Sequence, residues 1–411
     1  MLLKKFHDYA FCLVALLIPV GQPAVNVSII VLAFAFLLNG RPQEKPDFKI
    51  RGLILIPVFF YALHLLGLFH SVNLKYGFLD IETKLSFLLF PLMFFIRPLE
   101  LTKLNLAKLM FVLGCVSMCL YNIVNSSIQY HQTKSIDVFY YISFSKLMHV
   151  QYLTIYLNIA ILIVMEYLFD GKAKKFSLAI GLFLILFFFV NISFLSSRLA
   201  TIVCYITVAL FMVLKTKQKQ LVFKYWPYAS LLVALVFFTD YFVLSHFNRF
   251  REVEIFFNTD QNFLEFDRKE YNSTNIRIPL WINAAQVIEK NKIFGVGTGD
   301  IKEELDSVYL KNKFAYAAEH HFSPHNQVFH TGVILGFTGI FMLLAMLLVP
   351  LYYSIRYKSY LLMCFIVIIL INMMTESILE RQAGIILFAF FYVVLITELY
   401  NQIRKSEELS A

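Results

Sequence analysis

Long uninterrupted runs of apolar residues dominate the sequence, and they decide what the chain can fold into. Clear examples are residues 176–190, 199–214, 228–244, 333–353 and 385–396. A helix of about 20 residues spans the hydrocarbon core of a bilayer, and in lipid every backbone amide needs a partner within the protein. Only helices and closed barrels meet that demand, and the runs lack the alternating pattern of a barrel. The sequence therefore predicts an all-α integral membrane protein.

The composition excludes an ordinary soluble domain. Hydrophobic residues make up 59% of the 411 residues, charged residues make up 15%, and the mean hydropathy is +0.69. A soluble surface needs more charge than this. The net charge of +9 lies in short basic clusters between apolar runs, as membrane topology requires, so we expect no nucleic-acid partner. The five cysteines fall inside apolar runs and are predicted to be packing residues.

The apolar runs predict about twelve transmembrane helices. They lie near residues 8–20, 23–39, 53–70, 84–96, 107–126, 149–168, 176–193, 198–214, 226–245, 331–353, 360–375 and 383–400. The first two runs are short and closely spaced, which leaves a re-entrant hairpin open. A signal peptide is the alternative for the N-terminus, although the many later spans favour a retained anchor.

Basic residues between the spans predict the orientation. If the N-terminus is cytoplasmic, the cytoplasmic segments hold twenty lysines and arginines and the short outer segments hold six. Loops rich in lysine and arginine stay in the cytoplasm, so the long loop lies outside, at the periplasmic face of a bacterial inner membrane. We divide the chain into N-terminal transmembrane helices (1–245), a periplasmic loop (246–330) and C-terminal transmembrane helices (331–411).

Two helices are predicted within the long loop, over residues 278–290 and 301–311, and a glycine-rich stretch at 294–300 separates them. The glycine-rich stretch follows no buried strand and has no lysine after its last glycine. A tight turn is therefore favoured over a phosphate-binding loop.

Three histidines, His320, His321 and His325, precede the next span. A metal site is one interpretation, but the histidines lack a helical His-x3-His pattern with a glutamate, and Pro324 interrupts a helix there. An imidazole titrates near neutral pH, which suits a general base. We favour a catalytic base over an interfacial polar cluster.

Several motifs resemble the O-antigen ligase family. His325-Asn326, nine further residues and Gly336-Phe337-Thr338-Gly339 resemble its His-[Asn/Ser/Gln]-x9-Gly-x-x-Gly signature. Three other segments fit in order and spacing: Ser196-Ser197-Arg198, Arg277-x3-Trp281-x2-Ala284 with 293–297, and Thr375-Glu376-Ser377. The resemblance covers the C-terminal half of the chain, whereas the first half matches in hydropathy.

The resemblance implies a GT-C-like membrane glycosyltransferase. Its donor would be a glycan on undecaprenyl diphosphate, and its acceptor lipid A–core, another glycan or a protein, with membrane lipids as further partners. The implied transfer is inverting and independent of metals and cofactors. Ligation to lipid A–core is favoured, and polymerisation or protein glycosylation is the alternative. A transporter is the competing class, but the middle of each predicted span carries almost no charge.

The predicted catalytic residues are His325, Arg277 and Arg198. His325 would take the acceptor's proton, and the arginines would grip the diphosphate with paired hydrogen bonds. Because a diphosphate is a weak base, its departure needs no strong acid from the protein. Snorkelling to the interface is the alternative for Arg198, and a loop salt bridge to Asp267 or Glu270 is the alternative for Arg277.

Substrate contacts are predicted from the residues that flank these motifs. The predicted substrate-binding residues are His321, Asn326, Gly295 and Gly297, and no metal ligand is predicted.

Overall fold

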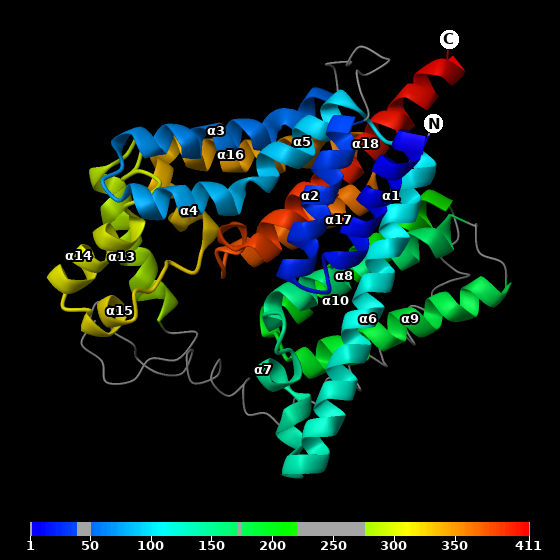
Figure 1. Ribbon diagram of the computed structural model, residues 1–411, viewed down its shortest axis with the longest axis horizontal. Coiled ribbons are helices and arrows are strands. Elements are labelled where there is room, and N and C mark those ends of the chain that lie inside the picture. The colour runs from blue at the N-terminus through cyan, green and yellow to red at the C-terminus, as the bar shows by residue number, and fades with distance from the viewer. Residues whose placement is uncertain (1, 39–50, 171–174, 220–275, 411) are drawn as a thin grey trace.

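The computed structural model describes residues 2–38, 51–170, 175–219 and 276–410, and these ranges are mostly helical, with turns between the helices and no strand (Figure 1). The helices are α1 (Leu2–Leu17), α2 (Gln22–Leu38), η1 (Arg51–Leu55), α3 (Ile56–Gly67), η2 (Leu68–His70), α4 (Leu74–Lys84), α5 (Ser86–Ile96), α6 (Leu101–Thr133), η3 (Ile136–Phe139), α7 (Tyr141–Phe144), α8 (Val150–Phe169), α9 (Lys175–Leu195), α10 (Arg198–Lys219), α13 (Arg277–Lys290), α14 (Ile301–Lys311), α15 (Ala315–Glu319), α16 (Gln327–Arg356), α17 (Tyr360–Met373), η4 (Ile378–Glu380) and α18 (Gln382–Ser410).

Seven helical segments in the described ranges are long and apolar enough to cross a bilayer, which confirms a multi-pass helical protein. They are Arg51–His70, Leu101–Thr133, Val150–Phe169, Leu178–Leu195, Leu199–Lys217, Gln327–Arg356 and Gln382–Lys405. α2 and α17 are shorter apolar helices. The predicted span at 226–245 and the loop residues up to 275 lie outside the described ranges, so the total of about twelve spans stays a prediction.

The centre of the bundle is formed by α8 and α18, which are apolar around most of their circumference. Most of the membrane-spanning stretch of each helix is buried by its neighbours, as expected for a helix without a polar face. α18 packs against α5, α6, α8 and α17. Phenylalanine rings fill these contacts: Phe390 stacks on Phe11, and Phe391 meets Phe111 edge to face. The five cysteines are free and buried, which confirms their prediction as packing residues.

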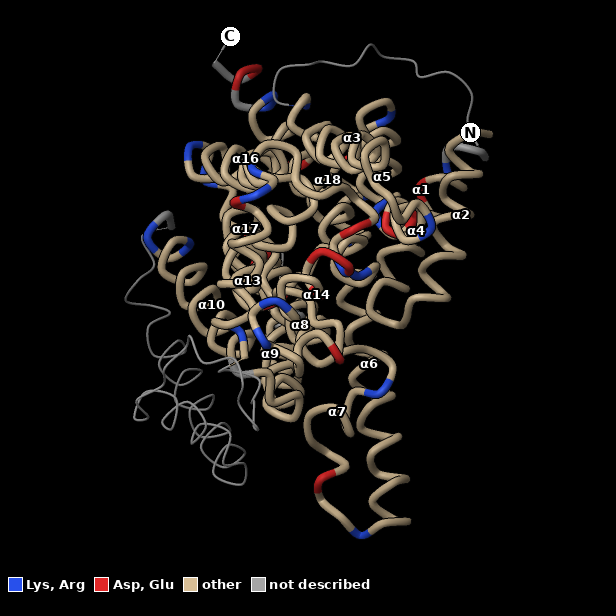
Figure 2. The backbone as a smooth tube through the Cα atoms, turned by 90° about the vertical axis from the view of Figure 1, so that its left-hand side faces the viewer, with Lys and Arg blue, Asp and Glu red and all other residues tan. Residues whose placement is uncertain are grey.

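Two lysines are buried inside the protein with carboxylate partners, which the sequence does not predict. Figure 2 shows long stretches of helix without charged residues and a gathering of charge around α4 and α14. Inside the bundle, Lys84 at the end of α4 and Lys108 on α6 are both buried. Lys108 pairs with Glu166 of α8 and Glu398 of α18, both at 2.8 Å. These residues lie at the ends of the predicted spans, so the expected scarcity of charge in the middle of each span is not contradicted, but their burial in ion pairs is not predicted.

Helix α16 is interrupted at Gly336, where φ is +63° and ψ is −154°. In a continuous helix the amides of Phe337 and Thr338 would donate to the carbonyls of Val333 and Ile334. These two helical hydrogen bonds are absent here. Instead, the segment from Lys292 to Gly297 donates hydrogen bonds to the two carbonyls and accepts hydrogen bonds from the two amides. The bonds are Val296 N to Val333 O at 2.9 Å, Gly297 N to Ile334 O at 3.0 Å, Phe337 N to Lys292 O at 2.7 Å and Thr338 N to Ile293 O at 3.3 Å.

The same glycine-rich stretch continues onto the α3–α4 turn, and we call residues 292–300 the glycine loop. The Thr298 hydroxyl donates to the carbonyl of His64 at 2.6 Å. The Asp300 carboxylate accepts from the amides of Val72 and Asn73 at 2.8 and 2.7 Å. The glycine loop therefore ties α16 to the start of α4 and fixes where α13 ends.

We predict that Gly336→Ala weakens the fold. A Cβ at residue 336 would lie 2.6 Å from the carbonyl atoms of Ile293 and Lys292, on a backbone that L-residues rarely adopt. The left-handed conformation and the overlap together should cost about 2 kcal/mol or more. Thermal unfolding in detergent should show a Tm several degrees lower, whereas Gly52→Ala, at a position with open space around it, should leave Tm unchanged. An unchanged Tm for Gly336→Ala would contradict the shared hydrogen bonds.

Candidate active site

His325 lies on the turn that joins α15 to α16 and is held there by its neighbours. Asn326 begins α16 as its N-cap, because its side-chain oxygen accepts from the amides of Val328 and Phe329 at 2.9 and 3.2 Å. The indole of Trp281 on α13 donates to the carbonyl of Pro324 at 2.9 Å. His325 itself has φ of +46°, a strained conformation that surrounding contacts must maintain.

The imidazole of His325 faces Glu376, which lies between α17 and α18. Its Nδ1 atom lies 3.2 and 3.3 Å from the two carboxylate oxygens, and the two side chains are 31% and 16% exposed. An ionised carboxylate can only accept, so Nδ1 carries the hydrogen and Nε2 of the neutral ring is left as the proton acceptor. This is the arrangement that a general base requires.

The ionised form of Glu376 is favoured by its neighbours. Burial raises the pKa of the Glu376 carboxyl, but the hydrogen bond from His325 and nearby positive charge, that of Arg277 included, outweigh burial and hold that pKa below its usual value. Arg277 is therefore close enough to act electrostatically on the His325–Glu376 pair. It is the first residue of α13 and is half-buried.

His149 and Arg381 border the same place, and sequence reasoning did not include them. Burial lowers the pKa of His149, with Glu376 opposing this and Arg381 and His325 adding to it, so the ring is neutral at neutral pH. His149 is the N-cap of α8, where its Nδ1 accepts from the amide of Gln151 at 3.4 Å. A signal existed for both residues: each lies at the predicted outer end of a span, as Glu376 does.

Arg198 begins α10, and its side chain lies outside the described residues. The register of α10 nonetheless places its first turn at the level of the site. Thr207 meets Asn158 of α8 and Cys364 of α17. At 1.5 Å per residue, Arg198, the start of α8 and the end of α17 each lie about 12–14 Å from that contact, in the same direction. This placement is compatible with the predicted catalytic role, which stays a prediction.

The other two histidines of the cluster have separate partners. His320 Nδ1 donates to the carbonyl of Tyr316 at 2.9 Å, and its ring stacks on Phe322. His321 Nδ1 lies 2.5 Å from Asp306 of α14, and the imidazole is half exposed. His321 thus ties α14 to the turn after α15, while its predicted contact with substrate stays a prediction. In the described part of the chain no group of three His, Cys, Asp or Glu side chains is placed to hold a metal ion.

The glycine loop and Asn326 have visible tasks in the fold. The five amides from Gly295 to Gly299 all donate to protein acceptors. This supports the turn over the phosphate-binding loop, because no amide of these five residues is left to bind phosphate. Asn326 is 1% exposed, and its side-chain nitrogen donates to the carbonyl of Met374 at 3.0 Å. The substrate-binding roles predicted for Gly295, Gly297 and Asn326 remain untested, whereas their structural roles are seen directly.

We predict a pH-dependent contribution of Glu376 to stability. Its folded pKa lies below the unfolded value of about 4.3, so the ionised carboxylate stabilises the fold at neutral pH, and this is lost as the pH falls through the folded value. Glu376→Gln should lower Tm by roughly 2–4 °C at pH 7, and the difference should narrow below about pH 4. Glu289→Gln on the exposed face of α13 serves as the control. A difference that widens on acidification would contradict the ionised pair.

Comparison with known proteins gives a family match over the central part of the chain. Residues 181–344 match the family model described as O-Antigen ligase, a stretch that runs from α9 into α16. The match encloses Arg198, Arg277, the glycine loop, His325 and Gly336, whereas Glu376 lies beyond it. No curated protein matches the chain. The match supports a membrane glycosyltransferase of the ligase or polymerase type, and it confirms the resemblance of this chain to the O-antigen ligase family.

Proposed function

We propose that the protein transfers a glycan from undecaprenyl diphosphate to an acceptor hydroxyl at the periplasmic face of the bacterial inner membrane, with lipid A–core as the acceptor. The His325–Glu376 pair beside Arg277 carries this proposal. It combines a base with cationic surroundings at one end of a helical bundle. The family match independently supports glycosyl transfer.

The residues suggest a direct displacement with inversion. The acceptor oxygen attacks the anomeric carbon of the donor sugar while the bond from that carbon to the diphosphate oxygen breaks. The proton of the acceptor hydroxyl passes to Nε2 of His325, and Glu376 stabilises the resulting imidazolium. The electron pair of the broken bond leaves with the diphosphate, whose growing charge is met by Arg277 and by Arg198. His321 is a further proposed substrate contact, and Gly295, Gly297 and Asn326 are proposed to serve the substrate site through the backbone that they hold in place.

Arg381 is a further candidate for the diphosphate. It is exposed, it follows η4 directly, and its charge reaches His149 at the edge of the site. An anion between Arg277 and Arg381 would face positive charge on two sides, which favours the leaving group more as its charge develops.

The proposed orientation predicts a labelling pattern. All five native cysteines are buried and free, so the unaltered protein should react little with a thiol reagent. Glu319 at the end of α15 and Lys358 after α16 are both exposed. In intact spheroplasts, a membrane-impermeant maleimide should label Glu319→Cys and should label Lys358→Cys only after lysis. The reverse pattern would place the site in the cytoplasm and overturn the proposal.

The catalytic role predicts a loss of transfer in His325→Ala. A general base contributes about 10²–10⁴-fold, so transfer by purified protein from a lipid-linked donor should fall at least about 100-fold. His320→Ala, an adjacent ring with its own partners, should retain activity. Unchanged transfer in His325→Ala would remove this residue from the mechanism.

The species that accumulates in cells carrying His325→Ala identifies the reaction. Long glycans left on the carrier indicate ligation. Single repeat units on the core indicate polymerisation, and unmodified protein acceptors indicate protein glycosylation.

A further inference from the structure

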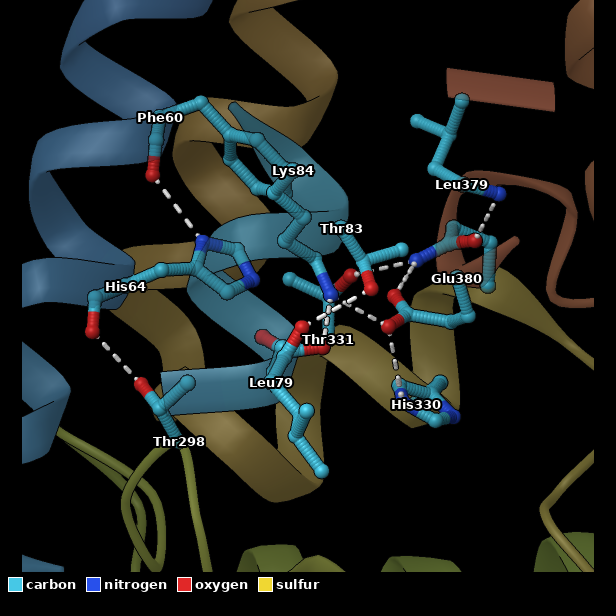
Figure 3. Close-up of polar contacts among 12 residues, drawn as sticks. Phe60, His64, Leu79, Thr83, Lys84, Thr298, His330, Thr331, Leu379 and Glu380 are labelled. Carbon is cyan, nitrogen blue, oxygen red and sulfur yellow. Dashed lines mark hydrogen bonds and ion pairs between the residues drawn. The ribbon is translucent and has the colours of Figure 1, made fainter. Parts of the chain in front are cut away.

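A group of charged and polar side chains with little exposure to solvent surrounds Lys84 and Glu380 (Figure 3). We call it the Lys84 cluster, and its members are Lys84 and Asp80 of α4, Gln327 and His330 of α16, and Glu380 of η4. The Lys84 side chain is fully buried and forms ion pairs with Asp80 and with Glu380, the latter at 2.5 Å. Lys84 thus joins α4 to η4, and the carboxylate of Glu380 joins both elements to Gln327 and His330 of α16.

Glu380 is the centre of the cluster. Its Oε1 accepts from Gln327 Nε2 at 2.6 Å, and its Oε2 lies 2.5 Å from Lys84 Nζ and 3.2 Å from His330 Nε2. Burial raises the pKa of the Glu380 carboxyl, but the charges of His330 and Lys84 outweigh burial and hold that pKa well below its usual range. The carboxylate is therefore ionised and accepts from all three side chains.

The cluster joins the two segments that also carry the catalytic pair. Gln327 and His330 lie on the first turn of α16, shortly after His325. Glu380 lies four residues after Glu376. The side-chain oxygen of Gln327 also accepts from the amide of Leu379 at 2.8 Å. A shift of the α17–α18 segment against α16 that separated Glu376 from His325 would also have to strain these hydrogen bonds.

Lys84 also connects these contacts between α16 and the α17–α18 segment to α13, through α4. α4, which ends at Lys84, begins at the turn held by the Asp300 carboxylate of the glycine loop. The glycine loop follows directly on α13, whose first residue is Arg277. The cluster therefore binds directly to the elements that supply the base and its carboxylate partner, and it is connected to α13 through α4 and the glycine loop.

We propose that Lys84 and Glu380 are positioning residues that hold Glu376 against His325, without contacting substrate themselves. This inference rests on the proposed function for its consequence in catalysis. An imidazolium that forms as the acceptor loses its proton is stabilised less when the carboxylate moves away, so the chemical step slows while donor binding is retained.

The chain offers a matched control in Lys108. Like Lys84, it is a buried lysine between two carboxylates, those of Glu166 and Glu398. Its partners lie on α8 and α18 near their cytoplasmic ends in the proposed orientation, at the opposite end of these helices from His149 and Gln382. Lys84→Met and Lys108→Met thus make the same chemical change, near the site and away from it.

The first test is a double-mutant cycle on thermal stability, which needs no activity. Glu376→Gln is combined with Lys84→Met and, separately, with Lys108→Met. If Lys84 positions Glu376, the loss of Tm caused by Glu376→Gln should largely disappear in the Lys84→Met background and persist in the Lys108→Met background. Equal losses in both backgrounds would overturn the proposal. Should Lys84→Met fail to fold, Glu380→Gln takes its place in the cycle.

The second test measures kcat and KM for the lipid-linked donor. Lys84→Met and Glu380→Gln should lower kcat at least about tenfold with KM within about twofold of the original, since misplacement by 1 Å is enough for such an effect. Lys108→Met should retain the original kcat in the folded fraction. Lys84→Arg, which keeps the positive charge, should have a higher kcat than Lys84→Met. An equal fall in kcat for the two methionine variants would overturn the positioning role. Failure of the unaltered protein to transfer glycan would instead overturn the proposed function, and the stability cycle would still decide whether Lys84 positions Glu376.

Discussion

The peptide groups freed by the break in α16 impose the constraint on which the site depends. A helix that opens within a membrane protein leaves carbonyls and amides that lipid cannot satisfy. In this protein the backbone of the glycine loop forms hydrogen bonds with them, so the loop lies directly against the backbone of α16. Such close approach excludes a Cβ at Gly295 and at Gly336, where backbone atoms of the partner segment occupy its place. The position of α13, and with it Arg277, follows from this exchange.

Hydropathy and turn chemistry predict much of the fold because both are local properties of the chain. The predicted helices at 278–290 and 301–311 match α13 and α14 to within one residue. Each predicted span in the described ranges overlaps a helix. The predicted span at 84–96 matches the apolar helix α5. The helix α4 before it is not predicted, because it carries four charged residues and has no apolar run.

The candidate site was predicted only in part, because its geometry depends on distant contacts. His325 and Arg277 were identified from motifs and lie in one electrostatic neighbourhood. Glu376, on the other hand, enters the sequence analysis only within the segment Thr375-Glu376-Ser377 and without a partner, whereas it faces His325 from 51 positions away in the chain. Lys84 and Glu380 meet across 296 positions. A single sequence contains no signal for such pairs, since each member is compatible with an exposed helix end.

The exchange of hydrogen bonds between the glycine loop and α16 limits where the chain length can change. Each of the segments 292–297 and 333–338 offers two carbonyls followed by two amides. The carbonyls of one segment accept from the amides of the other, so the spacing within both segments must match. An inserted or deleted residue in either segment would shift every later donor away from its acceptor. The residues between the two segments take no part in that register, so insertions are tolerated there as far as α14, α15 and the His325 turn allow. Related chains with this architecture should therefore vary in length between the two segments and keep the length of each segment constant.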